Sequence, residues 1–296
     1  MTKIPKSIVI AALARDCEKT LPKIIYLIEQ LRERFEWTHV VVVENDSKDK
    51  TKEILFDWEK RKNDVKILSQ NFGNLTIPLE YKDNVSPLLS FHRIDKMVLY
   101  RNMYIKYIKE IPHNIDNIIV IDIDIESFLV EAVVDSILRC EAKCGGIFAN
   151  GVTVKRILGV FYFKIFYDVF AVSEYPISRT FSYTEASLYK TLKSVTKKLK
   201  YNELYRVVSA FGGIAVYNYK AIIDLEYRIV SNAANYKEAI CEHIPFNTEI
   251  IKLGYENYIA KDMEVIYGVH SFGSILKYYL PKIFFDFLLK ISRIIK

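Results

Sequence analysis

Three carboxylates stand on one extended segment, at Asp122, Asp124 and Glu126 of the sequence IVIDIDIE. Alternate side chains of an extended chain share a face, so these groups project together where an apolar strand ends. Carboxylate oxygens are the ligands that hard cations prefer, and Mg²⁺ or Mn²⁺ held by one or two of them can bridge to diphosphate oxygens. The segment therefore predicts a divalent metal site, with a solvated acidic turn as the alternative.

A second group of polar residues follows an apolar run, in the sequence VVVVENDSKDKT. Glu44 and Asp46 stand where the predicted strand ends, and carboxylates there can accept hydrogen bonds from ribose hydroxyls or base N–H groups. Ser47 and Asp49 are typical of a turn and of a helix start, which explains them adequately. Glu44 and Asp46 are therefore the candidates for nucleotide contact.

Three arginines are candidates for contacts with phosphate or ribose. Arg15 follows the first predicted strand, where its guanidinium could meet a nucleotide or phosphate. Arg93 and Arg101 are eight residues apart on a predicted helix and lie on neighbouring faces that point toward the acidic strand. Ordinary surface ion pairing is the alternative explanation for these two side chains.

The elements that must position these residues alternate between strand-like and helix-like patterns. Apolar runs predict strands over residues 7–14, 39–44, 65–69 and 117–124, and amphipathic or charged stretches predict helices over 18–35, 50–61 and 94–109. This rhythm predicts an α/β fold with a mostly parallel central sheet flanked by helices. Ligands of such sheets bind at the carboxyl ends of the strands, so the loops after Ala14, Glu44 and Val120 are the expected site.

The second half of the chain has weaker periodicity. Between residues 151 and 205 aromatic residues mix with lysines, and we interpret this stretch as a region that covers the open edge of the sheet. The sequence VVSAFGGIAVYNYKAI then predicts a strand whose Gly-Gly pair allows close approach of the backbone. Residues 1–272 are therefore expected to form one continuous catalytic domain.

Residues 273–296 are expected to form a basic amphipathic helix. Lys282, Asp286, Lys290 and Arg293 recur at spacings of four, four and three residues and form one polar stripe on an otherwise apolar helix. Such a helix either lies on an anionic membrane surface or packs on the body of the protein.

Composition limits the classes of partner and the location of the chain. With 296 residues, of which 51% are hydrophobic, it can bury a sizeable core, and its net charge of +6 suits anionic partners such as nucleotides or an acidic membrane face. Neither a transmembrane run nor a secretory signal pattern is evident, so the four cysteines are expected to be reduced thiols. A cytoplasmic protein, peripheral at a membrane through its last helix, is the resulting expectation.

The order of several short motifs resembles the GT-A glycosyltransferases, and within them the fungal capsule-associated α-1,3-mannosyltransferase family. The motifs that carry the resemblance are ALARDCEKTLP, VENDSKDKT, RIDKMVLYRN, VIDIDIE, FYDVFA and FGGIAVYNYKAI followed by CEH. The resemblance implies a Rossmann-like GT-A fold and transfer of a hexose, with mannose favoured, from a nucleoside-diphosphate sugar. It also implies GDP-mannose as the favoured donor, with a UDP-sugar as the alternative, and a glycan or lipid-linked hydroxyl as the acceptor.

The resemblance also implies roles for individual residues. Arg15, Glu44 and Asp46 would line the nucleotide, and Arg101 would brace the donor. Asp124 would ligate Mn²⁺ or Mg²⁺ with Asp122 near the ribose or a water, and His270 resembles a late histidine that completes the metal shell.

Glu242, in the CEH segment, would face the donor sugar or the acceptor hydroxyl. In an inverting enzyme it would be the general base that deprotonates the acceptor. In a retaining enzyme, which the resemblance favours, no such base is required, and Glu242 would stabilise positive charge on the sugar or orient a hydroxyl.

Three other classes of protein also fit part of the pattern. A nucleotidyltransferase that forms sugar nucleotides uses an α/β domain with metal-binding aspartates, but the first strand is not followed by a Gly-rich loop. A metal-dependent nuclease is disfavoured because no basic run adjoins the acidic strand, so nucleic acid is not an expected partner. The non-enzymatic alternative is a sugar-nucleotide-binding module.

Overall fold

In a computed structural model of the chain, residues 2–73, 75, 77, 86–157, 161–178 and 180–268 are described. The strands are β1 Ile4–Ala14, β2 Phe35–Asn45, β3 Val65–Gln70, β4 Asn117–Asp122, β5 Ser127–Phe128, β6 Cys144–Ile157, β7 Phe161–Phe166, β8 Leu204–Val207, β9 Ile214–Asn218, β10 Ser231–Asn232, β11 Asn235–Ala239 and β12 Glu256–Ile266. The α-helices are α1 Leu21–Arg32, α2 Thr51–Arg61, α3 Phe91–Lys109, α4 Val130–Arg139, α5 Glu185–Tyr201, α6 Tyr219–Ile222 and α7 His243–Lys252. Short 3₁₀ turns occur at Pro87–Leu89 and Val169–Ala171.

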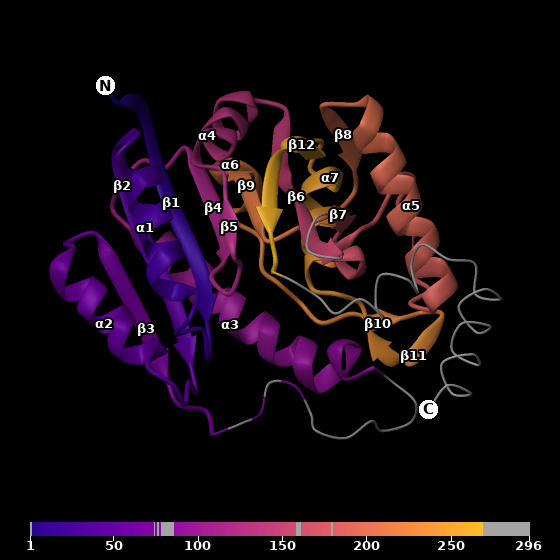
Figure 1. The fold of residues 1–296 in the computed structure, drawn as a ribbon, viewed down its shortest axis with the longest axis horizontal. Coiled ribbons are helices and arrows are strands. Elements are labelled where there is room, and N and C mark those ends of the chain that lie inside the picture. The colour runs from indigo at the N-terminus through magenta and orange to yellow at the C-terminus, as the bar shows by residue number, and fades with distance from the viewer. Residues whose placement is uncertain are drawn as a thin grey trace.

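One sheet crosses the molecule in the order β3-β2-β1-β4-β9-β6-β12-β5, with β7 paired to β6 and β8 paired to β12 (Figure 1). The strands β3, β2, β1 and β4 are parallel, and β6 is parallel to β12. Between these two groups β9 runs antiparallel to both β4 and β6. The mostly parallel α/β sheet predicted from the apolar runs is therefore confirmed.

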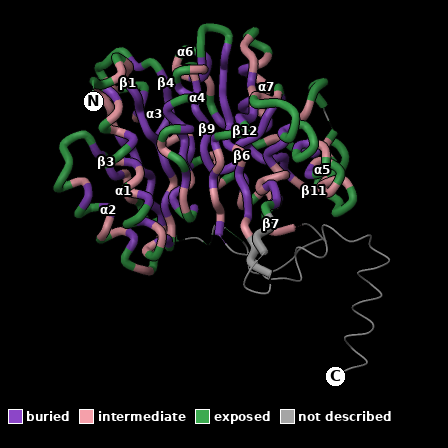
Figure 2. Tube along the Cα trace, turned by 45° about the horizontal axis from the view of Figure 1, so that its top comes forward, coloured by how far each residue is buried: buried purple, intermediate pink, exposed green. Residues whose placement is uncertain are grey.

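The sheet is covered by helices on both faces because its central strands are apolar on both sides. On β1, Ile8, Ile10 and Ala12 pack with buried residues of α1, α2 and α4, whereas Val9 and Ala11 face the opposite core with residues of α3 and α7. All five side chains are completely buried, as expected for an internal parallel strand. Figure 2 shows the buried strands between outer segments that reach the solvent.

The register of the parallel strands brings three loops to one edge of the sheet. Ala14 of β1 pairs with Glu44 of β2, and Leu13 of β1 pairs with Asp122 of β4. Three strands that are far apart in the sequence therefore end side by side, so the residues after them face a common space.

The region between residues 151 and 205 differs from our interpretation. It extends the sheet instead of covering its edge: β6 reaches Ile157 and pairs antiparallel with β7, and α5 follows. In Figure 1 α5 and β8 lie at the end of the sheet opposite to β1 and β2.

Two predictions concern residues beyond the described part of the chain. His270 and the amphipathic helix of residues 273–296 both lie outside the described residues, so the domain boundary at 272 stays a prediction. Each helix within the described segments is too short or too polar to cross a bilayer.

Candidate active site

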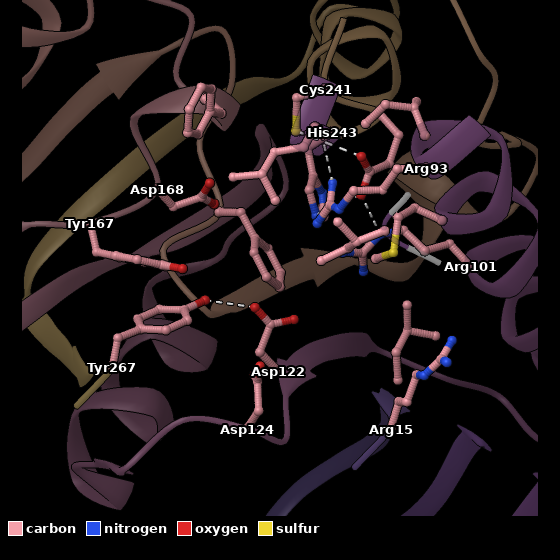
Figure 3. A pocket seen from close by; sticks show the side chains of 18 of the residues that line it. Arg15, Arg93, Arg101, Asp122, Asp124, Tyr167, Asp168, Cys241, His243 and Tyr267 are labelled. Atoms are coloured by element: carbon pink, nitrogen blue, oxygen red, sulfur yellow. Dashed lines mark hydrogen bonds and ion pairs between the residues drawn. The ribbon is translucent and has the colours of Figure 1, made fainter. Parts of the chain in front are cut away.

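A cavity of about 820 Å³ opens at the carboxyl ends of β1 and β4. It is lined by residues from the loop after β1, from α3, from the end of β4, from the segment after β7 and from the start of α7. Figure 3 shows the side chains that line it. Six of the predicted site residues are among them: Arg15, Arg93, Arg101, Asp122, Asp124 and Glu242.

Asp122 and Asp124 form the acidic edge of this cavity. The peptide N–H of Asp122 donates to the carbonyl oxygen of Gly213 at 2.8 Å. The Oδ2 of the Asp122 side chain accepts a hydrogen bond from the Tyr267 hydroxyl at 2.6 Å. Burial, together with the negative charge of Asp124, raises the pKa of Asp122 to about 7. A bound cation would relieve this repulsion, because an opposite charge favours the ionised carboxylate.

The donor set at this edge fits a hard divalent cation. Asp122 and Asp124 offer only oxygen ligands. Proteins typically bind Mg²⁺ or Mn²⁺ through one or two carboxylates, and phosphate oxygens and water complete the coordination shell. Within the described segments, no group of three or more His, Cys, Asp or Glu residues is arranged to hold a metal on its own. Diphosphate oxygens would therefore have to supply part of the coordination shell.

Glu44 at the end of β2 and Asp46 just after it are the residues predicted to contact the nucleotide, and neither is among the residues that line the cavity. Glu44 is completely buried and accepts hydrogen bonds from the Ser47 peptide N–H at 2.9 Å and from the Ser69 hydroxyl. Asp46 has a positive φ of 52° and accepts from the Gly73 N–H at 2.7 Å. Both carboxylates hold the turn, and Asn45 between them lines the cavity.

Arg101 and Glu242 form a buried ion pair that joins α3 to the start of α7. The Arg101 Nε donates to Glu242 Oε1 at 2.9 Å, and the two side chains are 4% and 3% exposed. The guanidinium also lies over the rings of Phe211 and Tyr227, at 5.3 and 5.6 Å from their centroids. Both charges are buried away from water, and each is neutralised by the other. The ion pair therefore links α3 to the start of α7 at the cavity.

The ion pair determines what Glu242 can do. Burial alone would raise the pKa of Glu242, but the charge and hydrogen bond of Arg101, with the charges of neighbouring groups including Arg93, together outweigh burial and lower that pKa to about 2. A carboxylate with this pKa is a weak proton acceptor at neutral pH, since an efficient general base has a pKa near the working pH. The geometry favours an orienting or electrostatic role for Glu242 over that of a base.

Arg93 is the second cation that α3 directs to the cavity. One of its terminal amino groups donates to the Leu88 carbonyl oxygen at 3.1 Å. Its buried Nε has no hydrogen-bond partner among the described residues. The Nε of Arg93 can therefore donate a hydrogen bond to a bound ligand. Figure 3 shows Arg93 near His243 at the cavity.

The sequence patterns missed Asp168, which enters the cavity after β7. It adopts a left-handed backbone conformation with φ 63°, and its carboxylate accepts a hydrogen bond from the Gly212 peptide N–H. Burial and the nearby charge of Asp122 raise the pKa of Asp168 to about 7. Asp168 lies in the FYDVFA motif that carries the family resemblance, but that motif alone does not indicate a role for its acid.

The Gly-Gly turn before β9 positions both aspartates. Gly212 and Gly213 have φ values of 62° and 92°, a region that favours glycine. A Cβ on Gly212 would lie 2.2 Å from the Ala149 carbonyl oxygen. The turn presents the Gly212 N–H to Asp168 and the Gly213 carbonyl to the backbone of Asp122. The close backbone approach predicted for this Gly-Gly pair is confirmed.

Comparison with known protein families gives one match across most of the chain. The profile of the family described as Cryptococcal mannosyltransferase 1 matches residues 7–248. No curated protein matches the sequence.

Comparison with solved structures identifies GT-A glycosyltransferases. A mannosyltransferase from Pyrobaculum calidifontis, solved with GDP-mannose and Mn²⁺, has a TM-score of 0.50 and 11% sequence identity over 89% of this chain. The GalNAc-T7 structure with UDP, GalNAc and Mn²⁺ has the same TM-score, identity and coverage of this chain. The chain spans about half of each, 57% and 44% of their lengths. These similarities show the fold.

Proposed function

The chain belongs to the Cryptococcal mannosyltransferase 1 family, a family of glycosyltransferases, and on this premise we propose that it is a metal-dependent enzyme that transfers mannose from GDP-mannose. The observation that carries the proposal is the pair Asp122 and Asp124 at the end of β4, in a cavity of about 820 Å³ beside three arginines. The acceptor would be a hydroxyl of a glycan or a glycolipid.

Asp124 and Asp122 are the residues that would hold Mn²⁺ or Mg²⁺. The cation would bind the donor diphosphate and neutralise the charge that develops on the leaving group. Asp124, whose side chain is exposed at the cavity, is the more accessible ligand, whereas one oxygen of Asp122 is already engaged by Tyr267. Tyr267 thereby orients Asp122, as hydrogen-bond partners of metal ligands commonly do.

The nucleoside is proposed to bind on the side of the cavity that is formed by the ends of β1 and β2. Arg15 and Asn45 line it there, and Glu44 and Asp46 support the turn that carries Asn45. GDP is favoured as the nucleotide because the P. calidifontis mannosyltransferase was solved with GDP-mannose and Mn²⁺. A UDP-sugar is the alternative, since GalNAc-T7 was solved with UDP.

We further propose that transfer retains the anomeric configuration. A retaining enzyme needs no protein base for the acceptor, and Glu242 is bound to Arg101 with a pKa lowered to about 2, although burial opposes that shift. Glu242 would then contribute negative charge beside the sugar, where positive charge develops during transfer. An inverting enzyme is the alternative and would require another proton acceptor.

Donor turnover tests the proposed function. Purified protein is incubated with GDP-mannose or UDP-sugars in the presence of Mn²⁺, and release of the nucleoside diphosphate is measured. We expect release of GDP that stops when EDTA is added and is absent in Asp124→Asn. An exposed acid on α4, changed as Asp135→Asn, is the matched control and should leave release unchanged. Release that is equal in Asp124→Asn and wild type would refute the metal assignment.

A further inference from the structure

His243 is a buried polar side chain with unused hydrogen-bonding groups at the cavity. It is 2% exposed, it lines the cavity, and neither ring nitrogen has a hydrogen-bond partner among the described residues. Its ring stacks on Phe211 at a centroid distance of 4.2 Å, and its Nε2 lies 3.9 Å from Glu242 Oε1, beyond hydrogen-bond range. Such orphaned buried groups are rare in native proteins and call for a partner.

The protonation state of His243 defines which partner it would accept. Burial, followed by the positive charge of Arg101, holds the pKa of His243 well below its ordinary value, so the ring is neutral at neutral pH. A neutral imidazole offers one N–H donor and one acceptor nitrogen. A hydroxyl group, which both donates and accepts, matches this pair of functions, whereas an anion could use only the donor.

Asp168 adds acceptor capacity to the same part of the cavity. The Gly212 N–H is the hydrogen-bond donor to its carboxylate among the described residues, and a carboxylate can accept about four hydrogen bonds. Figure 3 places Asp168, His243 and Arg93 on one side of the cavity, apart from Asp124 and Arg15. Two carboxylates, those of Asp168 and Glu242, disfavour a phosphate here, but together with the Arg93 donor they suit a pair of sugar hydroxyls.

We propose that Asp168 and His243 form the subsite that binds hydroxyl groups of the donor hexose, an inference that rests on the proposed transfer from GDP-mannose. The order of groups along the cavity supports this assignment. With the nucleoside beside Arg15 and the diphosphate at Asp122 and Asp124, the hexose extends away from Arg15, toward Asp168 and His243. Asp168 accepts from one hydroxyl, and His243 completes the hydrogen bonds of a second.

Two variants separate this role from a purely structural one. Asp168→Asn keeps the shape and the acceptor for Gly212, and Asn is among the residues that tolerate the left-handed conformation at this position. His243→Phe keeps the ring that stacks on Phe211 but removes both nitrogens. Exposed residues distant from the cavity provide the matched controls, Asp224→Asn and His113→Phe.

The measurement compares the affinity for GDP with that for GDP-mannose, by calorimetry in Mn²⁺. Each subsite variant should bind GDP-mannose about 10- to 100-fold more weakly, which is the usual cost of a lost hydrogen bond to a charged or buried group, and GDP within about twofold of wild type. The preference for GDP-mannose over GDP-glucose should fall as well. Thermal melting of each variant confirms that it is folded.

Two results would overturn the subsite and are distinguishable from failure of the proposed function. If the folded variants keep the wild-type ratio of GDP-mannose to GDP affinity and the wild-type preference between epimers, Asp168 and His243 do not bind the donor sugar. If wild-type protein binds GDP in Mn²⁺ but GDP-mannose no more tightly, the donor hexose has no subsite here. Wild-type protein that binds neither ligand would overturn the proposed donor itself.

Discussion

Replacing Glu242 by Gln removes the negative partner of a buried cation. In the wild-type protein Arg101 Nε donates to Glu242 Oε1 at 2.9 Å, and less than a twentieth of either side chain is exposed. Glutamine has nearly the same shape and keeps an oxygen for the hydrogen bond, but it leaves the Arg101 charge uncompensated. Removal of one partner from a buried ion pair is strongly destabilising because the remaining charge has lost both water and its counterion.

Two lines of reasoning give similar magnitudes for the loss. Breaking a buried pair by removing one partner costs about 3–5 kcal/mol in free energy of unfolding. Burial raises the pKa of Glu242, but Arg101 and the other neighbouring groups lower it on balance from 4.5 to about 2, a shift that corresponds to about 3 kcal/mol. In a domain of this size a loss of about 3 kcal/mol lowers the melting temperature by roughly 6–12 °C.

The pH dependence of stability provides the sharper assay. Because the folded-state pKa of Glu242 lies below its unfolded value, its contribution is fully present above pH 4.5 and is lost as the pH falls toward about 2. The difference in free energy of unfolding between wild type and Glu242→Gln should therefore be constant near neutral pH and shrink below pH 4.5. Urea titrations at a series of pH values measure it.

The exposed ion pair of Arg61 with Asp57 is the matched control. Their atoms are 2.7 Å apart, but the side chains are 65% and 62% exposed, so Asp57→Asn should cost less than about 1 kcal/mol. The double variant Arg101→Met with Glu242→Gln should recover part of the lost stability, because it leaves no unpaired charge. Equal stability of Glu242→Gln and wild type from pH 7 to pH 3 would refute the reasoning.

Three further predictions concern the metal edge and the Gly-Gly turn. Asp124→Asn should abolish Mn²⁺-dependent GDP release but leave the melting temperature within about 1 °C, since it removes an exposed ligand and no core volume; a shift of several degrees would make Asp124 structural. Tyr267→Phe loses the 2.6 Å hydrogen bond to Asp122 and should weaken Mn²⁺ binding at least about tenfold in a calorimetric titration; unchanged binding would show that Tyr267 does not support the metal. Gly212→Ala would place a Cβ 2.2 Å from the Ala149 carbonyl oxygen at φ 62°, and urea denaturation should reveal a loss of about 3 kcal/mol; a loss under 1 kcal/mol would contradict the close approach.

The fold of the N-terminal half was predictable because its strands are apolar on both faces. The runs VVVV before Glu44 and IIVI before Asp122 form internal strands that run parallel to β1, and the predicted helices follow the expected boundaries within a few residues. The rule that ligands bind at the carboxyl ends of such strands correctly brought Arg15 and Asp122 to one cavity.

The second half was less predictable because its pairing is nonlocal. The strand β6 pairs with β9 and β12, which follow it by dozens of residues, and its partner β7 mixes aromatic residues with Lys164. A pattern of alternating polarity says which face a residue occupies but does not identify the strand beside it. The sequence from residue 151 to residue 205 was therefore not sufficient to predict that this segment extends the sheet.

The site was predictable in its residue types and only partly in its contacts. Arg101 and Glu242 are 141 positions apart, so no spacing could indicate that they form one buried ion pair. Glu44 and Asp46 stand at the predicted strand end, but Glu44 accepts from the nearby Ser47 N–H and Asp46 accepts from the Gly73 N–H, 27 positions away. The sequence pattern could not indicate the second of these contacts. Asp168 lies in the FYDVFA motif, but its role was missed because the sequence does not show that the Gly212 turn lies beside it.

The central claim is that Asp122 and Asp124 hold a divalent cation together with the diphosphate of GDP. Calorimetric titration of the protein with GDP, in the presence and in the absence of Mn²⁺, tests it most directly. Because cation and diphosphate share one coordination shell, Mn²⁺ should increase GDP affinity at least about tenfold in wild type and not in Asp124→Asn. GDP affinity that is independent of Mn²⁺ in the wild-type protein would contradict the account.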